Sequence, residues 1–197
     1  GSNALTGVVP VIVNNSTILA EVENGTKTSH SRITAGDSIG IIAAADSDIY
    51  IIAGGLAAAG ANAAGASINT AILKNDIQAH AGTWTELMTT ATPAVQTSSN
   101  GIRIPNRNER RRGIIIFANG NEDVVMVSVS AGAGGSNAIT GVINTLVVRN
   151  TVKATSREHV TISVKKAAGS STNDTDPLPG VYIEAHDDTE LLNLAGA

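Results

Sequence analysis

The sequence repeats itself at long range, and this repeat restricts the fold more than any other feature. Residues 63–81, AAGASINTAILKNDIQAHA, align with residues 138–156, AITGVINTLVVRNTVKATS, at a shift of 75 positions. A shorter copy that starts at Thr6 matches residues 65–79 at a shift of 59. A second motif, residues 48–52, recurs at residues 123–127 with the same shift of 75, and residues 46–54 match residues 188–196. Two motifs in one register indicate equivalent units that stack on one another.

Each motif alternates between apolar and polar residues. Within residues 76–81, DIQAHA, apolar side chains occupy every second position, which is the period of a half-buried β-strand. Bounding Asn, Asp and Gly residues indicate turns. The stretch 53–65, AGGLAAAGANAAG, is interpreted as a tight strand or turn, because each of its four glycines would cost a helix roughly 1 kcal/mol. We expect interior positions at Ile18, Ala20, Ile77, Ala79, Val152 and Ala154, and outward positions at Thr17, Asp76, Gln78, Thr151 and Lys153.

The composition restricts the kind of core that can form. Hydrophobic residues make up 42% of the chain but aromatic residues only 2%, so the core must consist of Ala, Val, Ile and Leu. A solenoid suits such a core, because each rung buries small side chains against its neighbours. The sequence therefore predicts an all-β fold, specifically a parallel β-helix. Residues 1–197 would form one solenoid fragment with approximate units 6–64, 65–139 and 140–197. An inserted loop is expected at about 83–112. With rungs of about 20 residues, each unit would supply about three rungs. The alternative is a β-sandwich, which accounts for the strands but not for the repeat.

Several classes of function are excluded by composition. The net charge of −4 argues against nucleic-acid binding. No run of 18 apolar residues occurs, so no membrane span is expected in this fragment. The absence of cysteine excludes disulfides, thiolate catalysis and Cys-ligated zinc, and no cofactor is expected. No signal peptide is visible, and an export signal is expected outside these residues. Four histidines lack metal-ligand spacing and are expected on the solvated surface: His30, His80, His159 and His186.

Acidic residues need separate treatment, because glycosidases use a pair of carboxylates. Asp46 and Asp48 could form such a pair, but equivalent positions of the other copies hold Asp123, Asp188 and Glu190. A residue that recurs with the repeat is interpreted as a turn residue placed just before a strand. We therefore expect the protein not to be an enzyme and to have no catalytic residues.

The segment 103–112 has an unusual charge, with five arginines against one glutamate. The plain interpretation is a solvated loop. The functional hypothesis is an anion site for a sulfated glycan or an acidic lipid, since arginine forks suit sulfate and carboxylate groups. A protease-cleavage site is a third interpretation. The candidate ligand-binding residues are Arg103, Arg107, Arg110, Arg111, Arg112 and Trp84, the last as a stacking platform for a sugar ring or else as a packed residue. Length variation in the repeat falls in segments 21–40, 80–112 and 155–183, which hold ten of the thirteen Lys and Arg residues and are expected on one side of the shaft.

One run of residues, with the motifs that follow it, supports a family resemblance. Residues 45–55, ADSDIYIIAGG, are followed by Gly60, Gly65, the run SINT at 67–70 and the run NDIQA at 75–79. This pattern resembles the repeat of the fusobacterial leukotoxin family and of related haemagglutinin/haemolysin-like filamentous adhesins, over most of the chain outside residues 83–112 and 165–180. The resemblance implies a surface or secreted passenger of a very large protein, exported by an autotransporter or two-partner route, with a right-handed β-helical stalk. It implies no catalytic residue. The chain departs from the pattern at Pro10 and at the insertion around residues 103–112.

These observations lead us to expect a structural and adhesive segment of a large secreted or surface-exposed bacterial adhesin. Loops on one face would bind a host-surface glycan or matrix protein, and the exposed strand edges of a solenoid fragment would favour end-to-end self-association. One alternative is a segment of a secreted cytolysin. An amphipathic helix or a long apolar hairpin would favour it, and neither is identified in the sequence. A β-helical carbohydrate-active enzyme is the other alternative, which a single cluster of carboxylates would favour.

Overall fold

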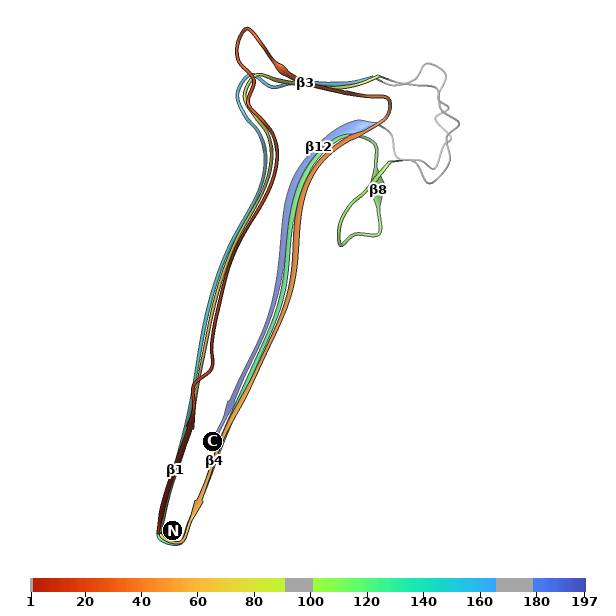
Figure 1. The fold of residues 1–197 in the computed structure, drawn as a ribbon. Coiled ribbons are helices and arrows are strands. Elements are labelled where there is room, and N and C mark those ends of the chain that lie inside the picture. The colour runs from red at the N-terminus through yellow and green to blue at the C-terminus, as the bar shows by residue number, and fades with distance from the viewer. Residues whose placement is uncertain (1, 91–100, 166–178) are drawn as a thin grey trace.

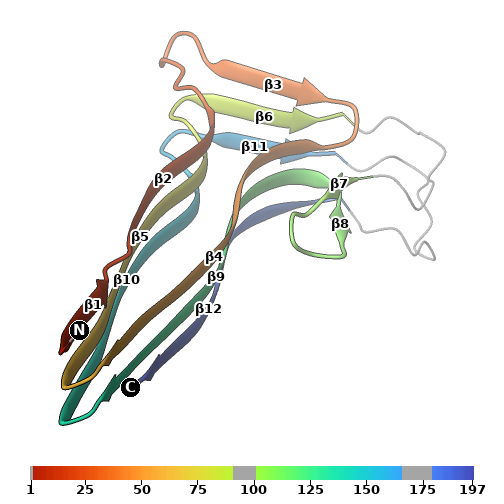
Figure 2. The same cartoon turned by 60° about the horizontal axis from the view of Figure 1, so that its bottom comes forward.

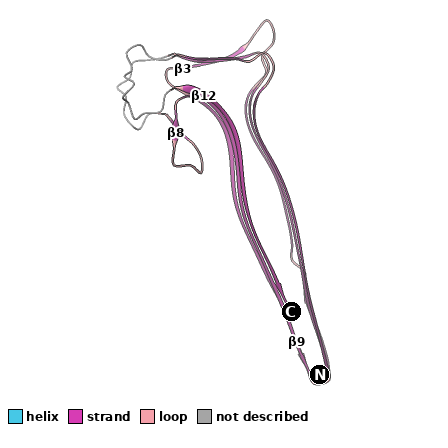
Figure 3. Cartoon of the chain, turned by 180° about the vertical axis from the view of Figure 1, so that it is seen from behind, coloured by secondary structure: helices cyan, strands magenta, loops and turns pink. Residues whose placement is uncertain are grey.

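A computed structural model describes residues 2–90, 101–165 and 179–197 of the chain, and among these residues it contains β-strands and no helix (Figure 3). The prediction of an all-β fold is confirmed. The strands are β1 (Asn3–Val8), β2 (Val11–Val22), β3 (Ser31–Ala35), β4 (Ile39–Ala59), β5 (Asn62–Ala81), β6 (Thr85–Thr89), β7 (Ile102–Arg103), β8 (Arg110–Arg111), β9 (Gly113–Gly134), β10 (Asn137–Ser156), β11 (Thr161–Val164) and β12 (Gly180–Gly196).

Three parallel sheets are built by three successive passages of the chain. Sheet I contains β1 and β2, then β5, then β10. Sheet II contains β3, β6 and β11, and sheet III contains β4, β9 and β12. Each passage contributes to all three sheets, so the strands fall into a first layer (β1–β4), a middle layer (β5, β6 and β9) and a third layer (β10–β12). Figures 1 and 2 show the three layers running side by side. Among the strands of the described residues, β7 and β8, a small hairpin inserted before β9, are the one pair that runs antiparallel.

The register between layers confirms the alignment of the two sequence motifs. Ile77 pairs with Ile18 of the first layer and Val152 of the third. Asp123 pairs in the same way with Asp48 and Glu190. Each repeat therefore forms one large layer rather than three small rungs, and the expectation of about three rungs per unit is wrong. The cause is strand length: β5 and β10 each extend over 20 residues without a turn.

Pro10 accounts for the one break in sheet I. It stands opposite Asn69, between the end of β1 and the start of β2. Proline has no backbone N–H to donate to the neighbouring strand. Its carbonyl still accepts a hydrogen bond from the Thr70 N–H at 3.1 Å, so the two strands continue on the same neighbour.

Sheets I and III face each other along a narrow arm, and sheet II lies across the opposite, wide end (Figure 1). Small residues allow this close approach. A Cβ on Gly55 would come within 2.7 Å of the Ala66 carbonyl oxygen of sheet I, and one on Gly65 within 2.9 Å of the Ala131 oxygen of sheet III. The stretch 53–65 is therefore a crowded strand–turn–strand, in agreement with its interpretation from sequence.

The interior holds two apolar clusters, one at each end of the facing sheets. At the wide end, Ile77 and Ala79 are fully buried, and Ile18, Ala20, Val152 and Ala154 pack partly buried against the same cluster. In the arm, Leu73 and Met126 form the buried centre of a second cluster. All six predicted interior positions are therefore confirmed. The five predicted outward positions lie on the outer face of sheet I and are exposed or partly exposed.

Polar residues also point inward, and they pair across the layers. Asn69 donates to the Ser128 hydroxyl, which in turn donates to Asn144. Glu122 is fully buried and accepts hydrogen bonds from the amides of Asn75, at 2.9 Å, and Asn150. Burial raises the pKa of the Glu122 carboxyl above its ordinary value, against the effect of these hydrogen bonds.

Candidate ligand-binding face on sheet III

The arginine-rich segment forms a hairpin that packs one face against the protein and exposes the other, so the interpretation as a solvated loop holds only for its exposed face. Its hairpin, β7 and β8, covers the wide-end part of the outer face of sheet III. Ile104 of the hairpin is buried against Ile115 and Phe117 of β9, with Ile102 partly buried beside them. These apolar contacts, together with Ile42 of the first layer, fix the hairpin on the sheet.

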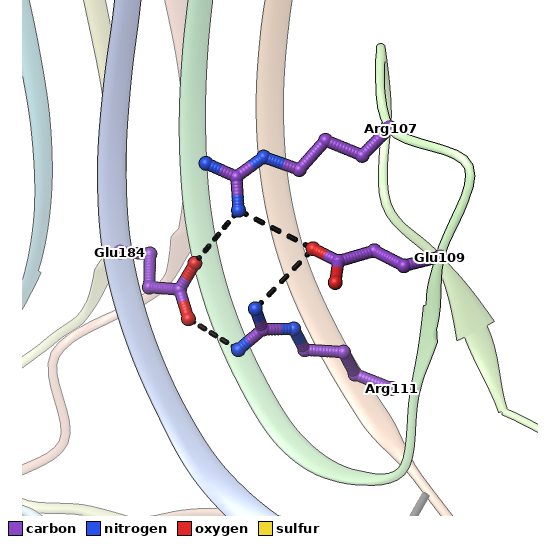
Figure 4. A network of polar contacts seen from close by, with 4 residues as sticks. All are labelled: Arg107, Glu109, Arg111 and Glu184. Atoms are coloured by element: carbon purple, nitrogen blue, oxygen red, sulfur yellow. Dashed lines mark hydrogen bonds and ion pairs between the residues drawn. The ribbon is translucent and has the colours of Figure 1, made fainter. Parts of the chain in front are cut away.

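Two arginines of the hairpin are held by carboxylates (Figure 4). Arg107 Nη1 lies 3.2 Å from Glu184 Oε2 and 3.3 Å from Glu109 Oε1, and Arg111 contacts the same two carboxylates. Their guanidinium groups also lie over aromatic rings, Arg107 at 5.6 Å from the Phe117 centroid and Arg111 at 4.5 Å from that of Tyr182. Burial tends to raise the pKa of Glu109, but the two guanidinium groups outweigh it and lower that pKa.

A third arginine joins the hairpin to the first layer. The Arg112 side chain is buried and binds the Asp37 carboxylate, with its Nε 3.0 Å from Oδ1. This contact lowers the pKa of Asp37. Arg103 and Arg110 are exposed, and Arg110 donates to the Gly101 carbonyl at 2.8 Å. The structure thus separates the five predicted arginines into three that anchor the hairpin and two that face solvent.

Trp84 lies inside an aromatic stack at the corner between sheets I and II. Its indole stacks on the His159 ring of the third layer, with centroids 3.9 Å apart and planes at 12°. The His30 ring of the first layer lies 5.7 Å away on the other side, tilted by 34°. With an imidazole on each side, Trp84 is a packed residue, the second of its two sequence interpretations. This arrangement does not support a role for Trp84 as a stacking platform for a sugar ring.

Three histidines, His30, His159 and His186, are exposed, as the sequence analysis expected, but the fourth is not. His80 points outward from sheet I, as predicted, but it is buried and its Nε2 lies 2.8 Å from Glu21 Oε2. His30 Nδ1 lies 2.7 Å from Glu86 Oε1. The pKa of Glu86 is lowered by His30 and then by Arg32, which binds its other oxygen. Glu21, which lies beside His80 in the adjacent layer, accounts for the burial of this ring, which the pattern of one strand cannot reveal.

The recurring acids lie within strands, so their interpretation as turn residues is wrong. Asp46 and Asp48 are on β4, and their partners in register are on β9 and β12. They point outward, where solvent accommodates a charge at alternate strand positions. Asn121 stands between Asp46 and Asp188 in one row and donates to Asp46 Oδ1 at 2.8 Å. Among the described residues, no group of three His, Asp or Glu side chains is arranged to hold a metal ion.

Between the hairpin and these acids lies a depression of about 270 Å³. It is lined by Asn106 of the hairpin and by sheet III residues Asn119, Gly120, Asn121, His186 and Asp188. Asn119 is 1% exposed, and neither its amide nitrogen nor its amide oxygen has a partner within the described part of the chain. An amide, an imidazole and a carboxylate around one hollow can donate to and accept from hydroxyl groups.

Sequence reasoning missed the depression but could have found two of the anchors. The shift of 75 that pairs Asp48 with Asp123 also places Asp37 beside Arg112 and Trp84 beside His159. Nothing in the repeat places Asn106 over Asn119, because among the described residues the hairpin occurs in the middle layer alone.

Comparison of the chain with protein-family models, curated proteins and solved structures found no match. Within the described residues, no helix is long and apolar enough to cross a membrane.

Proposed function

We propose that the chain is a structural and adhesive segment of a large secreted or surface-exposed bacterial adhesin, built as a right-handed parallel β-helix with one large layer per repeat. The observation that carries this proposal is the residue-by-residue parallel register of successive layers. A chain with this register lengthens by adding layers, because each layer contacts only its neighbours. Such a shaft holds its inserted loops far from the cell that anchors it.

The binding site in this proposal is the depression beside Asn119, and the ligand is a host-surface glycan. Polar groups that converge on a small hollow suit sugar hydroxyls. A sulfated ligand is disfavoured at this position, because Arg107, Arg111 and Arg112 are paired with carboxylates and Asp188 lies on the rim. This proposal therefore replaces the site of five arginines with a largely neutral one.

Binding to an array of neutral, sulfated and sialylated glycans tests this proposal. The variant His186→Ala/Asp188→Asn removes two exposed groups from the depression and should weaken binding about tenfold, the loss of one to two hydrogen bonds. Lys153→Ala, on the outer face of sheet I, should leave binding unchanged. Retention on heparin or on matrix protein alone, or binding that survives the double variant, would contradict the assignment.

End-to-end self-association belongs to the same proposal. Within the described residues, the strands of the first and third layers have a neighbour on one side only. Open strand edges pair with other chains. Light scattering at increasing protein concentration should therefore detect association, and a strictly monomeric protein would count against it.

A segment of a cytolysin is the second candidate, and one observation favours it. The strands β4 and β5 carry an uncharged stretch, residues 49–73, which turns back at residues 60–61. The sequence analysis found no long apolar hairpin, but this strand pair comes close to one. Its two strands belong to different sheets, however, so its backbone hydrogen bonds depend on neighbouring layers. Dye release from phospholipid vesicles would establish this candidate over the adhesin.

The proposal includes no catalytic role. Asp48 has an acidic residue in register in both other layers and Asp46 has one in the third layer, whereas an active site is needed once. Cleavage of any member of a broad polysaccharide panel, abolished by Asp48→Ala, would overturn this part of the proposal.

A further inference from the structure

The narrow arm of the molecule carries no charged side chain. It consists of residues 2–14, 49–73, 124–148 and 191–197, which contain no Asp, Glu, Lys, Arg or His. Its interior needs no charge, but both of its outer faces are apolar as well. On sheet I, Leu5 is 86% exposed, and on sheet III, Ile52 and Leu56 are 80% and 73% exposed. Soluble proteins seldom leave apolar surface of this extent uncovered without a partner.

Each apolar face ends at a row of polar side chains that runs across its three strands. The charged members of the two rows have opposite signs. On sheet I the row is Asn15, Lys74 and Arg149. On sheet III the row is Asp48, Asp123 and Glu190. Three carboxylates in adjacent parallel strands repel one another, because neighbouring strands lie only about 4.8 Å apart. The acidic row therefore favours a partner that brings positive charge.

The two rows lie at the same level of the molecule, on opposite sides. Across the interior, Asn75 donates to Glu122 at 2.9 Å, and Leu73 packs in one cluster with Val124. Lys74 and Asp123 lie between these contacts in their strands and point outward. A copy displaced perpendicular to the sheets would therefore place its basic row directly opposite the acidic row of the first molecule.

We infer that the narrow arm is an interface between copies of this chain, in which the outer face of sheet I of one copy packs on the outer face of sheet III of the next. Lys74 faces Asp123 of the neighbouring copy and Arg149 faces its Glu190, while Val11 and its apolar neighbours cover the apolar residues around Ile52. The interface joins two different surfaces, so it repeats and builds a lateral array. It is distinct from end-to-end pairing of strand edges.

The area of this interface is sufficient for weak association. Strands β4 and β9 each extend about 11 residues into the arm and β12 about six, so at about 3.3 Å per residue and about 4.8 Å between strands the sheet III face covers about 440 Å². Two such faces bury about 900 Å², in the range of weak association. The hairpin, β7 and β8, stands on sheet III at the wide end, beyond the charge row, and leaves this area uncovered. A lipid bilayer is a poorer occupant, because the open strand edges of the arm would lack hydrogen bonds in it.

Reversing each charge row tests the inference by sedimentation velocity, over protein concentrations from about 10 µM to about 1 mM, the range of weak association. Lys74→Glu/Arg149→Glu makes both rows acidic, and Asp123→Lys/Glu190→Lys gives both rows a net positive charge, with Asp48 unchanged. Each variant alone should associate at least about tenfold more weakly than the unmodified chain, because like charges then meet. An equimolar mixture of the two variants should recover association, since every sheet I face again meets a sheet III face of opposite charge.

The matched control for the Lys74/Arg149 variant is Arg103→Glu/Arg157→Glu, which makes the same change in net charge at the wide end and should associate like the unmodified chain. Far-UV circular dichroism establishes that each variant is folded. Association unaffected by either reversal would assign it to the strand edges and overturn the inference. A mixture that stays dissociated would also overturn it, and so would a monomeric chain that floats with phosphatidylcholine vesicles.

Discussion

The middle layer and the outer layers carry the same motif in the same register but bury it to different degrees. In one interior row of sheet III, Val124 of the middle layer is 1% exposed, whereas Leu191 of the third layer is 52% exposed. Ile77 is fully buried, while Ile18 and Val152 beside it are only partly buried. Burial here comes from the layers on each side rather than from the residue itself. Stability should therefore concentrate in the middle layer.

A cavity in the core should reveal the largest difference in stability between the layers. Ile77→Ala removes the same atoms as Ile18→Ala, but only Ile77 has packed layers on both sides. We expect Ile77→Ala to lower the free energy of unfolding by about 2–5 kcal/mol, as for other buried Ile-to-Ala changes, and Ile18→Ala to cost less than half as much. Urea denaturation followed by circular dichroism gives both values. Equal costs would mean that the layers do not bury one another as described.

The contact between Arg112 and Asp37 should have the next largest effect. It joins the hairpin of the middle layer to the first layer, and the guanidinium is buried. Arg112→Ala should destabilise the protein by about 1–3 kcal/mol, the range for a hydrogen bond to a charged group. Because Arg112 lowers the pKa of Asp37, the stabilisation is present at neutral pH and is lost as pH falls through the folded-state pKa. Arg103→Ala, at an exposed position of the same hairpin, is the control and should change stability by less than about 0.5 kcal/mol.

Glu122 should produce a smaller effect that depends on pH. Its row contains Ser47 in the first layer and Thr189 in the third, so the middle layer alone buries a carboxyl there. Burial raises its pKa in the folded state, so the folded protein binds the proton more tightly and becomes less stable as pH rises above the unfolded-state pKa. Glu122→Gln should remove this dependence between about pH 4.5 and neutral pH. Glu190→Gln, on the outer surface, should retain it; an unchanged pH profile in Glu122→Gln would contradict the assignment.

The sequence predicted the register and the interior, but not the size of the layer or the binding face. Two motifs with one shift are sufficient to pair Ile77 with Val152 and Asp48 with Asp123, because parallel layers preserve spacing along the chain. The prediction of short strands is wrong, because the period-two pattern does not show where a strand ends. The interior positions Asn69 and Asn75 are polar, yet the strand continues through both of them. The hairpin was misjudged because its partner Glu184 lies in the next layer, across a segment whose length differs between repeats.

In-register stacking of the layers is the central claim, and paired cysteines test it most directly, because the chain contains no cysteine of its own. Leu19 and Gln78 are neighbours in register on the outer face of sheet I. Adjacent strands, about 4.8 Å apart, lie within the Cα range of a disulfide. Leu19→Cys/Gln78→Cys should therefore form an intramolecular disulfide under mild oxidation, detected by mass spectrometry. The offset pair Leu19→Cys/Lys74→Cys, four residues out of register, should remain reduced. A disulfide in the offset pair, or none in the in-register pair, would contradict the stacked-layer fold.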